Sequence, residues 1–240
     1  MTTGLMWLAI AAVPAMLLLG FVFGRPAADG TGRLTKPLEL ATSVVVVGLA
    51  LALWLVYARG TSLEASALAL LAGMTAGLFG DLIMAKALPT PNRLIFGILA
   101  FGIGHVLYIV GFTLTAGAVG LAAPLTLWWL WGGALVLAAA LWRGMVYSPR
   151  TPPVLNVGSL LYAGLIALMA ACGAALAAQN GRFLGAAVGG ALFLVSDLIL
   201  GAREFRGTHW RLINDVVWVT YILGQELIAL TTLYALPLAL

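Results

Sequence analysis

The sequence predicts an all-α polytopic membrane protein with eight transmembrane helices. Hydrophobic residues make up 63% of the 240 residues and charged residues only 8%, whereas soluble domains carry roughly 25% charged residues. So few charges cannot cover a water-soluble surface, which excludes a soluble enzyme, a disordered chain and a nucleic-acid-binding protein. The apolar residues also fall into eight stretches of about 20 residues, the length that a membrane helix needs.

Further features of the sequence support several of these stretches as helices. No basic residue precedes the first stretch, so it is expected to be a retained helix and not a cleaved signal peptide. Pro37 and Pro153 open the second and sixth, as proline does in a first helical turn. Tryptophans typical of a membrane interface crowd the fifth, and the single cysteine, Cys172, is expected to pack inside the sixth. The predicted spans are Gly4–Phe23, Pro37–Tyr57, Leu63–Leu88, Arg93–Leu114, Pro124–Trp142, Pro153–Ala178, Phe183–Ala202 and Leu212–Leu236. They leave no soluble domain, so residues 1–240 are expected to form a single transmembrane domain.

The basic residues predict the orientation. The connections between spans are numbered in chain order. Two basic residues, Arg59 and Arg182, lie in even-numbered connections, and neither terminus holds a basic residue. Basic residues concentrate in cytoplasmic loops. The odd connections are therefore expected to face the cytoplasm and both termini the outside of a cell (inner) membrane. The other ten basic residues belong to the odd-numbered connections and are Arg25, Arg33, Lys36, Lys86, Arg93, Arg143, Arg150, Arg203, Arg206 and Arg211.

An internal similarity suggests duplication. Residues 79–83 (FGDLI) resemble residues 195–199 (VSDLI), and at the same offset Pro37 falls on Pro153 and His105 on Tyr221. An offset of four spans preserves orientation, which predicts two parallel four-helix repeats of about residues 1–118 and 119–240. Chance similarity of apolar sequence is the alternative.

Ionisable residues inside the spans are the candidate functional residues, because each costs at least ~2.5 kcal/mol at the bilayer centre. Asp81 and Asp197 are the hardest to explain as scaffold. At about 1.5 Å per residue, they and their polar companions fall in the cytoplasmic half, which predicts one pocket open to that side. Asp215 and Glu204 are interpreted as surface charges, Glu226 receives no role, and Lys36 with Glu39 is either an interfacial pair or functional. The companions are Lys36, His105, Tyr108, Tyr162, Tyr221 and Gln225.

Several familiar sites are missing from the sequence. There is no GxSxG nucleophile motif and no HExxH zinc motif. Gly102-Ile103-Gly104 lies within an apolar helix and therefore fails the context test for a nucleotide fingerprint. Two aspartates and a histidine are able to bind a metal, but their spacing has no metal signature. No cofactor and no metal ligand are predicted.

The ordered motifs resemble the YhhN family of integral-membrane lysoplasmalogenases. The similarity extends from the second span to the last. It runs through Thr35-Lys36-Pro37-Leu38, Gly80-Asp81, His105-Val106-Leu107-Tyr108, Tyr162 with Met169, Leu192-Phe193-Leu194-Val195-Ser196-Asp197 and Thr220-Tyr221-Ile222-Leu223-Gly224-Gln225.

The resemblance implies eight helices and hydrolysis of the vinyl-ether bond of lysoplasmalogens, which yields a fatty aldehyde and glycerophosphoethanolamine or glycerophosphocholine. It places catalysis on Asp81 and Asp197. Lys36, His105, Tyr108, Tyr162, Tyr221 and Gln225 would then bind substrate, a lysophospholipid taken from the bilayer. A proton-coupled transporter and a metal-dependent lipid hydrolase are the alternatives. The sequence predicts no oligomeric state.

Overall fold

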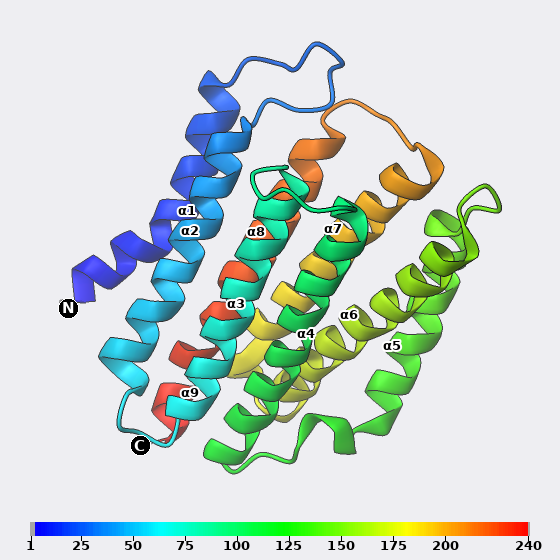
Figure 1. Cartoon of the computed structure of the whole chain (residues 1–240). Helices are drawn as coiled ribbons and strands as arrows, with labels where there is room; N and C mark the ends of the chain where they lie inside the picture. The colour runs from blue at the N-terminus through cyan, green and yellow to red at the C-terminus, as the bar shows by residue number, and fades with distance from the viewer. Residues whose placement is uncertain (1–2, 240) are drawn as a thin grey trace.

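The computed structural model describes residues 3–239, and these residues form a bundle of long helices without any strand (Figure 1). Eight helical segments are long and apolar enough to cross a membrane, as predicted. The α-helices are α1 (Thr3–Phe23), α2 (Lys36–Leu53), α3 (Glu64–Met84), α4 (Arg93–Ala118), α5 (Trp128–Leu141), α6 (Pro153–Gln179), α7 (Leu184–Arg206), α8 (Ile213–Ala229) and α9 (Thr231–Ala239). Short 3-10 turns cover Pro124–Thr126 and Gly181–Phe183, and π-helical turns cover Trp54–Ala58 and Trp142–Val146.

Local backbone chemistry explains where several helices end. The predicted third span ran to Leu88, but α3 ends at Met84 because Lys86 adopts a left-handed conformation with φ of 62°. The Asn92 side chain caps α4 by accepting hydrogen bonds from the amides of Leu94 and Ile95, the second and third residues of the helix. Gly207, with φ of 69°, ends α7 in the left-handed conformation that glycine adopts most readily.

The last two α-helices, α8 and α9, together make the eighth span. The sequence predicts one helix over Leu212–Leu236, whereas the helix is interrupted at Leu230 and continues as α9 to Ala239. The fifth span also differs, because Pro124–Thr126 forms a 3-10 turn and α5 begins only at Trp128. The predicted duplication of two four-helix halves stays a prediction.

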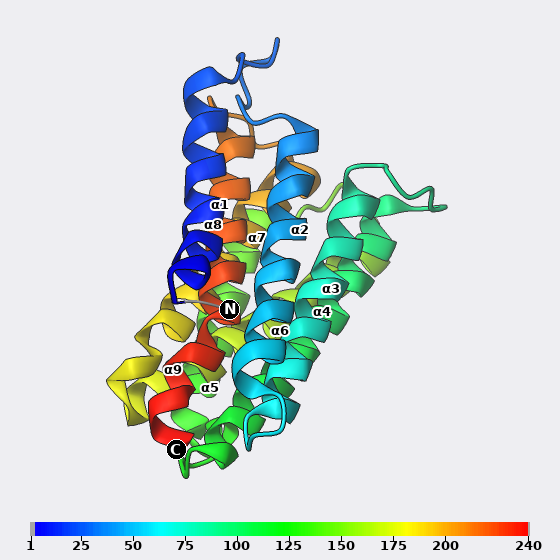
Figure 2. The same cartoon turned by 90° about the vertical axis from the view of Figure 1, so that its left-hand side faces the viewer.

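All ten basic residues of the odd connections lie at one end of the bundle, called here the basic end. The connections 24–35, 85–92, 147–152 and 207–212 meet there, at the top of Figure 1, while α9 lies near the opposite end and α1 begins about half-way along the bundle (Figures 1 and 2). One sequence interpretation is wrong here. Asp215 is only 1% exposed. Its carboxylate accepts hydrogen bonds from the amides of Arg33 (2.8 Å) and Leu34 (3.0 Å), so it ties the first connection to α8 instead of facing solvent.

Close helix packing surrounds the interior of the bundle. A β-carbon on Gly189 would lie 2.8 Å from the carbonyl oxygen of Gly224, and one on Gly190 would lie 2.8 Å from the α-carbon of Ala170. α7 therefore packs directly against the backbones of α8 and α6, as expected for small residues between membrane helices. The thiol of Cys172 is buried in this core, as predicted.

Candidate active site

Asp81 of α3 and Asp197 of α7 line the same pocket near the basic end. This pocket, called here the polar chamber, covers about 630 Å³ when the open space at its mouth is counted, and it lies between α2, α3, α4, α7 and α8. Lys36, Arg93 and Arg203 also line it. Glu39 lines it as well, so the chamber combines three carboxyl groups with three cationic side chains.

Asp81 ends a chain of buried hydrogen bonds. Its Oδ2 accepts from the Ser43 hydroxyl at 2.5 Å and from the Tyr221 hydroxyl at 2.9 Å. The Gln225 amide donates to the Tyr221 oxygen at 2.6 Å and accepts from the Tyr108 hydroxyl. Four of the predicted residues thus form one continuous chain that runs from the chamber into the interior of the bundle.

Two glycines of α3 make room for this chain. A β-carbon on Gly73 would lie 2.3 Å from the Tyr108 ring, and one on Gly77 would lie 2.6 Å from the Gln225 Nε2. Both distances are shorter than any ordinary van der Waals contact. The absence of side chains along this face of α3 therefore lets α4 and α8 bring their polar groups to Asp81.

Asp197 belongs to a second, shorter chain. Its Oδ2 accepts from the Tyr162 hydroxyl at 2.5 Å, and the Tyr162 oxygen lies 3.3 Å from the His105 Nε2. Since a phenol has one proton to donate, Tyr162 accepts from His105, which places the imidazole proton on Nε2. His105 is fully buried, and its Nδ1 finds no hydrogen-bond partner within residues 3–239.

An aromatic ring separates the two chains. The Phe193 ring lies 4.6 Å from the His105 ring and 5.1 Å from the Tyr221 ring, centroid to centroid, and meets both edge to face. Phe193 is 1% exposed and has no polar atom on its side chain. The two carboxyl groups therefore share the chamber, while within residues 3–239 their supporting chains meet only through aromatic rings, among them those of His105 and Tyr108.

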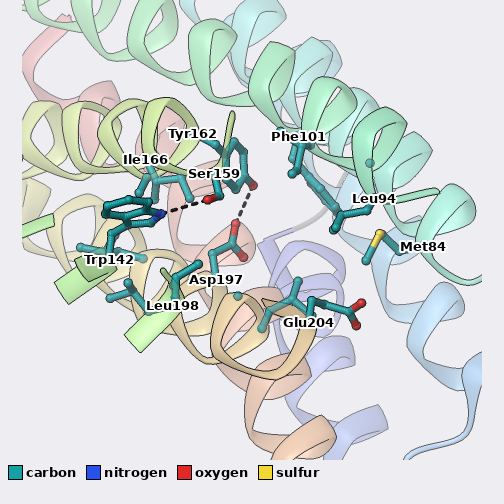
Figure 3. A pocket seen from close by; sticks show the side chains of 17 residues that line it. Met84, Leu94, Phe101, Trp142, Ser159, Tyr162, Ile166, Asp197, Leu198 and Glu204 are labelled. Carbon is teal, nitrogen blue, oxygen red and sulfur yellow. Dashed lines mark hydrogen bonds between the residues drawn. The ribbon is translucent and has the colours of Figure 1, made fainter. Parts of the chain in front are cut away.

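A second pocket, called here the apolar chamber, opens beside Asp197. It covers about 600 Å³ when the open space at its mouth is counted, and it lies between α4, α6, α7 and the π turn after α5. Figure 3 shows the Tyr162 hydroxyl directed at Asp197, with Phe101 facing them across the space. Asp197 and Phe101 line both chambers, so Asp197 stands where a polar and an apolar compartment meet.

Charged pairs shape the basic end of the polar chamber. Lys36 contacts Glu39 at 2.5 Å, with side chains 64% and 4% exposed respectively. Glu204 contacts Arg93 at 2.8 Å and Arg203 at 2.9 Å. With a side chain only 15% exposed, Glu204 is not the surface charge that the sequence suggested but holds two arginines in place.

Sequence reasoning missed Ser43, Arg93 and Arg203 as site residues. Ser43 looks like an ordinary small polar residue of a membrane helix, and the arginines look like topology signals. Only the contact of the Ser43 hydroxyl with Asp81, across 38 residues, gives it a place in the site. The hydroxyl of Ser196 is engaged elsewhere, since it donates to the Val217 carbonyl at 2.8 Å.

Other groups stay outside this arrangement. Glu226 is 4% exposed, and its Oε1 has no hydrogen-bond partner in the part of the chain that the structure describes. Over the same residues, 3–239, no three His, Cys, Asp or Glu side chains are placed to hold a metal ion together.

One comparison with known proteins found a match. The model of the YhhN family matches residues 40–232, about four fifths of the chain, and this stretch contains all the residues of both hydrogen-bond chains. No curated protein and no solved structure matches the chain significantly.

Proposed function

Because the chain belongs to the YhhN family, we propose that it hydrolyses the vinyl-ether bond of lysoplasmalogens within the membrane. The products would be a fatty aldehyde and glycerophosphoethanolamine or glycerophosphocholine. One observation carries the proposal: Asp197 lies between an apolar chamber and a polar chamber that also contains Asp81 and three cationic side chains. An amphiphile with a hydrocarbon chain, a scissile bond and a phosphate headgroup has the same order of parts.

The reaction needs an acid and a partner carboxylate. One carboxyl group, neutral at the start, protonates the alkenyl carbon and leaves an oxocarbenium ion. Water adds to this cation and gives its proton to the second carboxylate, which also stabilises the positive charge. The resulting hemiacetal collapses to the aldehyde and the glycerol hydroxyl. A proton has then passed from one carboxyl to the other, an arrangement that resembles the carboxyl pair of glycosidases.

We propose different parts for the two aspartates. In this proposal Asp197 is the acid, because it also lines the apolar chamber, where the alkenyl carbon would lie. Of the two chambers, Asp81 lines only the polar one. Its Oδ2 accepts hydrogen bonds from two hydroxyl groups, which suits a carboxylate that orients water. Tyr162 and Tyr221 would hold these carboxyls in position, each backed by its own chain.

The remaining predicted residues would act around this pair. His105 orients Tyr162, while Tyr108 and Gln225 orient Tyr221. Lys36, as an exposed ammonium group at the chamber, would meet the substrate phosphate as a point charge. The lysophospholipid is thus the proposed partner, delivered from the surrounding bilayer.

We also propose that the basic end faces the cytoplasm, which places both termini outside. The one cysteine, Cys172, is buried, so labelling by a thiol reagent is attributed to an introduced cysteine. Ala28→Cys at the basic end is expected to resist a membrane-impermeant thiol reagent in intact cells, whereas Ser62→Cys at the opposite end is expected to react. The reverse pattern would invert the assignment.

The first experiment measures aldehyde release from a lysoplasmenyl phospholipid by the purified protein in detergent. Wild-type protein is compared with Asp81→Asn and Asp197→Asn, each with and without a chelator. We expect release that persists with chelator and is lost in both variants. Asp29→Asn, in the connection between α1 and α2, provides a matched control and should retain full activity.

Other outcomes point elsewhere. Full activity in both site variants, with the proteins folded, would contradict the carboxyl mechanism. Loss of activity with chelator alone would favour a metal-dependent hydrolase. No release from wild-type protein would favour transport, and a flux assay in liposomes would then decide.

A further inference from the structure

A groove on the outside of the bundle leads toward the site. It lies between α4 and α6 and covers about 1000 Å³ when the open space in front of it is counted. We call it the lateral groove; Tyr162 alone among its lining residues has a polar side-chain atom. Leu99, Ile103 and Leu161 are 56%, 58% and 71% exposed along it. In a membrane this surface faces lipid chains.

The lateral groove adjoins the apolar chamber. Ile98 and Tyr162 line both spaces. The hydroxyl of Tyr162 contacts Asp197 at 2.5 Å, so the inner end of the groove lies one side chain away from a site carboxyl. The groove between α5 and α6, lined by Leu135 and Gly164 among others, does not include Tyr162 or any residue of the apolar chamber.

Two glycines keep the lateral groove open. A β-carbon on Gly102 would meet a single atom, the Leu165 Cδ2 at 3.8 Å, and one on Gly158 would meet nothing within 4 Å. Gly80 on α3 is the opposite case, because the Phe101 ring already fills the space beside it, 2.7 Å from a β-carbon. The glycines of the lateral groove therefore leave space that no neighbouring side chain occupies.

The length of the groove matches one leaflet. On α4 it extends from Ile98 to Leu107, which is about 14 Å at 1.5 Å per residue. Half of the hydrocarbon core is about 15 Å thick. Since α4 begins at Arg93, at the basic end, the groove covers the leaflet on that side.

We propose that the lateral groove binds the hydrocarbon chain of a single-chain phospholipid and admits it between α4 and α6 to the apolar chamber. This inference rests on the proposed function for the identity of the lipid and adds its route. The headgroup stays at the basic end, among Lys36, Arg93 and Arg203, while the chain passes Ile98 and Tyr162 into the leaflet. An annular bilayer lipid that merely covers the helices is the competing occupant.

Photo-cross-linking tests the route without requiring turnover. The probe is a lysophosphatidylethanolamine with a saturated alkyl ether, which has no vinyl-ether bond to cleave, and a diazirine at the chain end. We expect cross-links concentrated on the groove residues of α4 and α6, suppressed by excess unlabelled lysolipid, in wild-type protein and in Asp197→Asn alike. A diacyl probe with the same label shows the background of annular lipid. Identical labelling by both probes, without competition, would overturn the proposal.

Filling the groove provides the second arm. Gly102→Phe and Gly158→Phe each place a phenyl ring in open space. Neither should weaken its helix, because glycine is the least favourable helix residue after proline. We expect each to reduce the competed cross-linking and to slow aldehyde release from long-chain substrate by about ten-fold or more, with a smaller loss for a short-chain vinyl ether that ends inside the apolar chamber. Gly164→Phe, in the neighbouring groove, is the matched control and should change neither.

The two proposals fail in different ways. If wild-type protein releases no aldehyde but the competed cross-links map to the lateral groove, the route stands and the proposed reaction falls. If aldehyde is released while Gly102→Phe and Gly158→Phe behave as Gly164→Phe does, the reaction stands and the route falls.

Discussion

Replacing Gly77 by alanine tests whether the hydrogen-bond chain behind Asp81 supports activity. The new β-carbon would lie 2.6 Å from the Gln225 Nε2 and 3.3 Å from the Tyr221 oxygen, whereas ordinary contacts begin at 3.4 Å. The Gln225 amide is the far end of a flexible side chain, so it can retreat by about 0.8 Å without moving the backbone. That retreat disrupts its hydrogen bonds to Tyr221 and Tyr108.

The expected magnitude is the difference of two terms. A lost hydrogen bond that leaves a buried group unpaired destabilises by about 1–2 kcal/mol. Two such bonds amount to about 2–4 kcal/mol, while alanine in a helix returns about 1 kcal/mol relative to glycine. The free energy of unfolding should therefore fall by about 1–3 kcal/mol, and each kcal/mol lowers Tm by about 2–4 °C in a chain of this size.

Thermal unfolding in detergent and aldehyde release measure the two consequences. Tyr221 would lose its support from Gln225, so we expect release to fall by about ten-fold, equivalent to ~1.4 kcal/mol. Gly48→Ala is the matched control, since a β-carbon there has no atom within 4 Å; it should raise Tm slightly and leave release unchanged. If Gly77→Ala behaves as Gly48→Ala does, the hydrogen-bond chain has no part in activity.

Four further substitutions have defined outcomes. Ser43→Ala removes one of the two donors to Asp81 and should reduce aldehyde release by about ten-fold (~1.4 kcal/mol); an unchanged rate would remove Ser43 from the site. Lys36→Ala should raise KM and spare kcat, and a loss confined to kcat would contradict a phosphate contact. Asp215→Asn should lower the free energy of unfolding by about 1–2 kcal/mol, because it removes the negative charge that strengthens the hydrogen bonds from the Arg33 and Leu34 amides and turns one accepting oxygen into a donor; an unchanged Tm would contradict this. Glu226→Gln should retain full aldehyde release, because no hydrogen bond connects Glu226 to either chain within residues 3–239.

The sequence predicts most of the fold because hydropathy and chain length alone determine membrane spans. Eight predicted spans correspond to eight helical segments. The errors are local and have local causes. Lys86 in a left-handed conformation ends α3 early, and the break at Leu230 divides the last span. Neither feature changes the hydropathy of the chain, so a window of apolar residues cannot detect it.

The candidate site was predictable only where a residue violates the rules for a lipid environment. A carboxyl inside a membrane helix is costly wherever it lies, which is why Asp81 and Asp197 stand out in the sequence. Ser43 violates no such rule, and its importance depends on a contact with another helix. Asp215 and Glu204 were misjudged for the same reason, since nearby arginines in the sequence say nothing about which groups become buried.

The Phe193 ring has a consequence for how charge moves through the protein. It lies between the His105 and Tyr221 rings, and within residues 3–239 no hydrogen bond joins the two chains. Asp81 and Asp197 therefore face the polar chamber without a hydrogen-bonded path through the protein between them. In the proposed reaction, the proton that Asp197 gives up reaches Asp81 through the substrate and water, so proton transfer between the two carboxyl groups is tied to turnover.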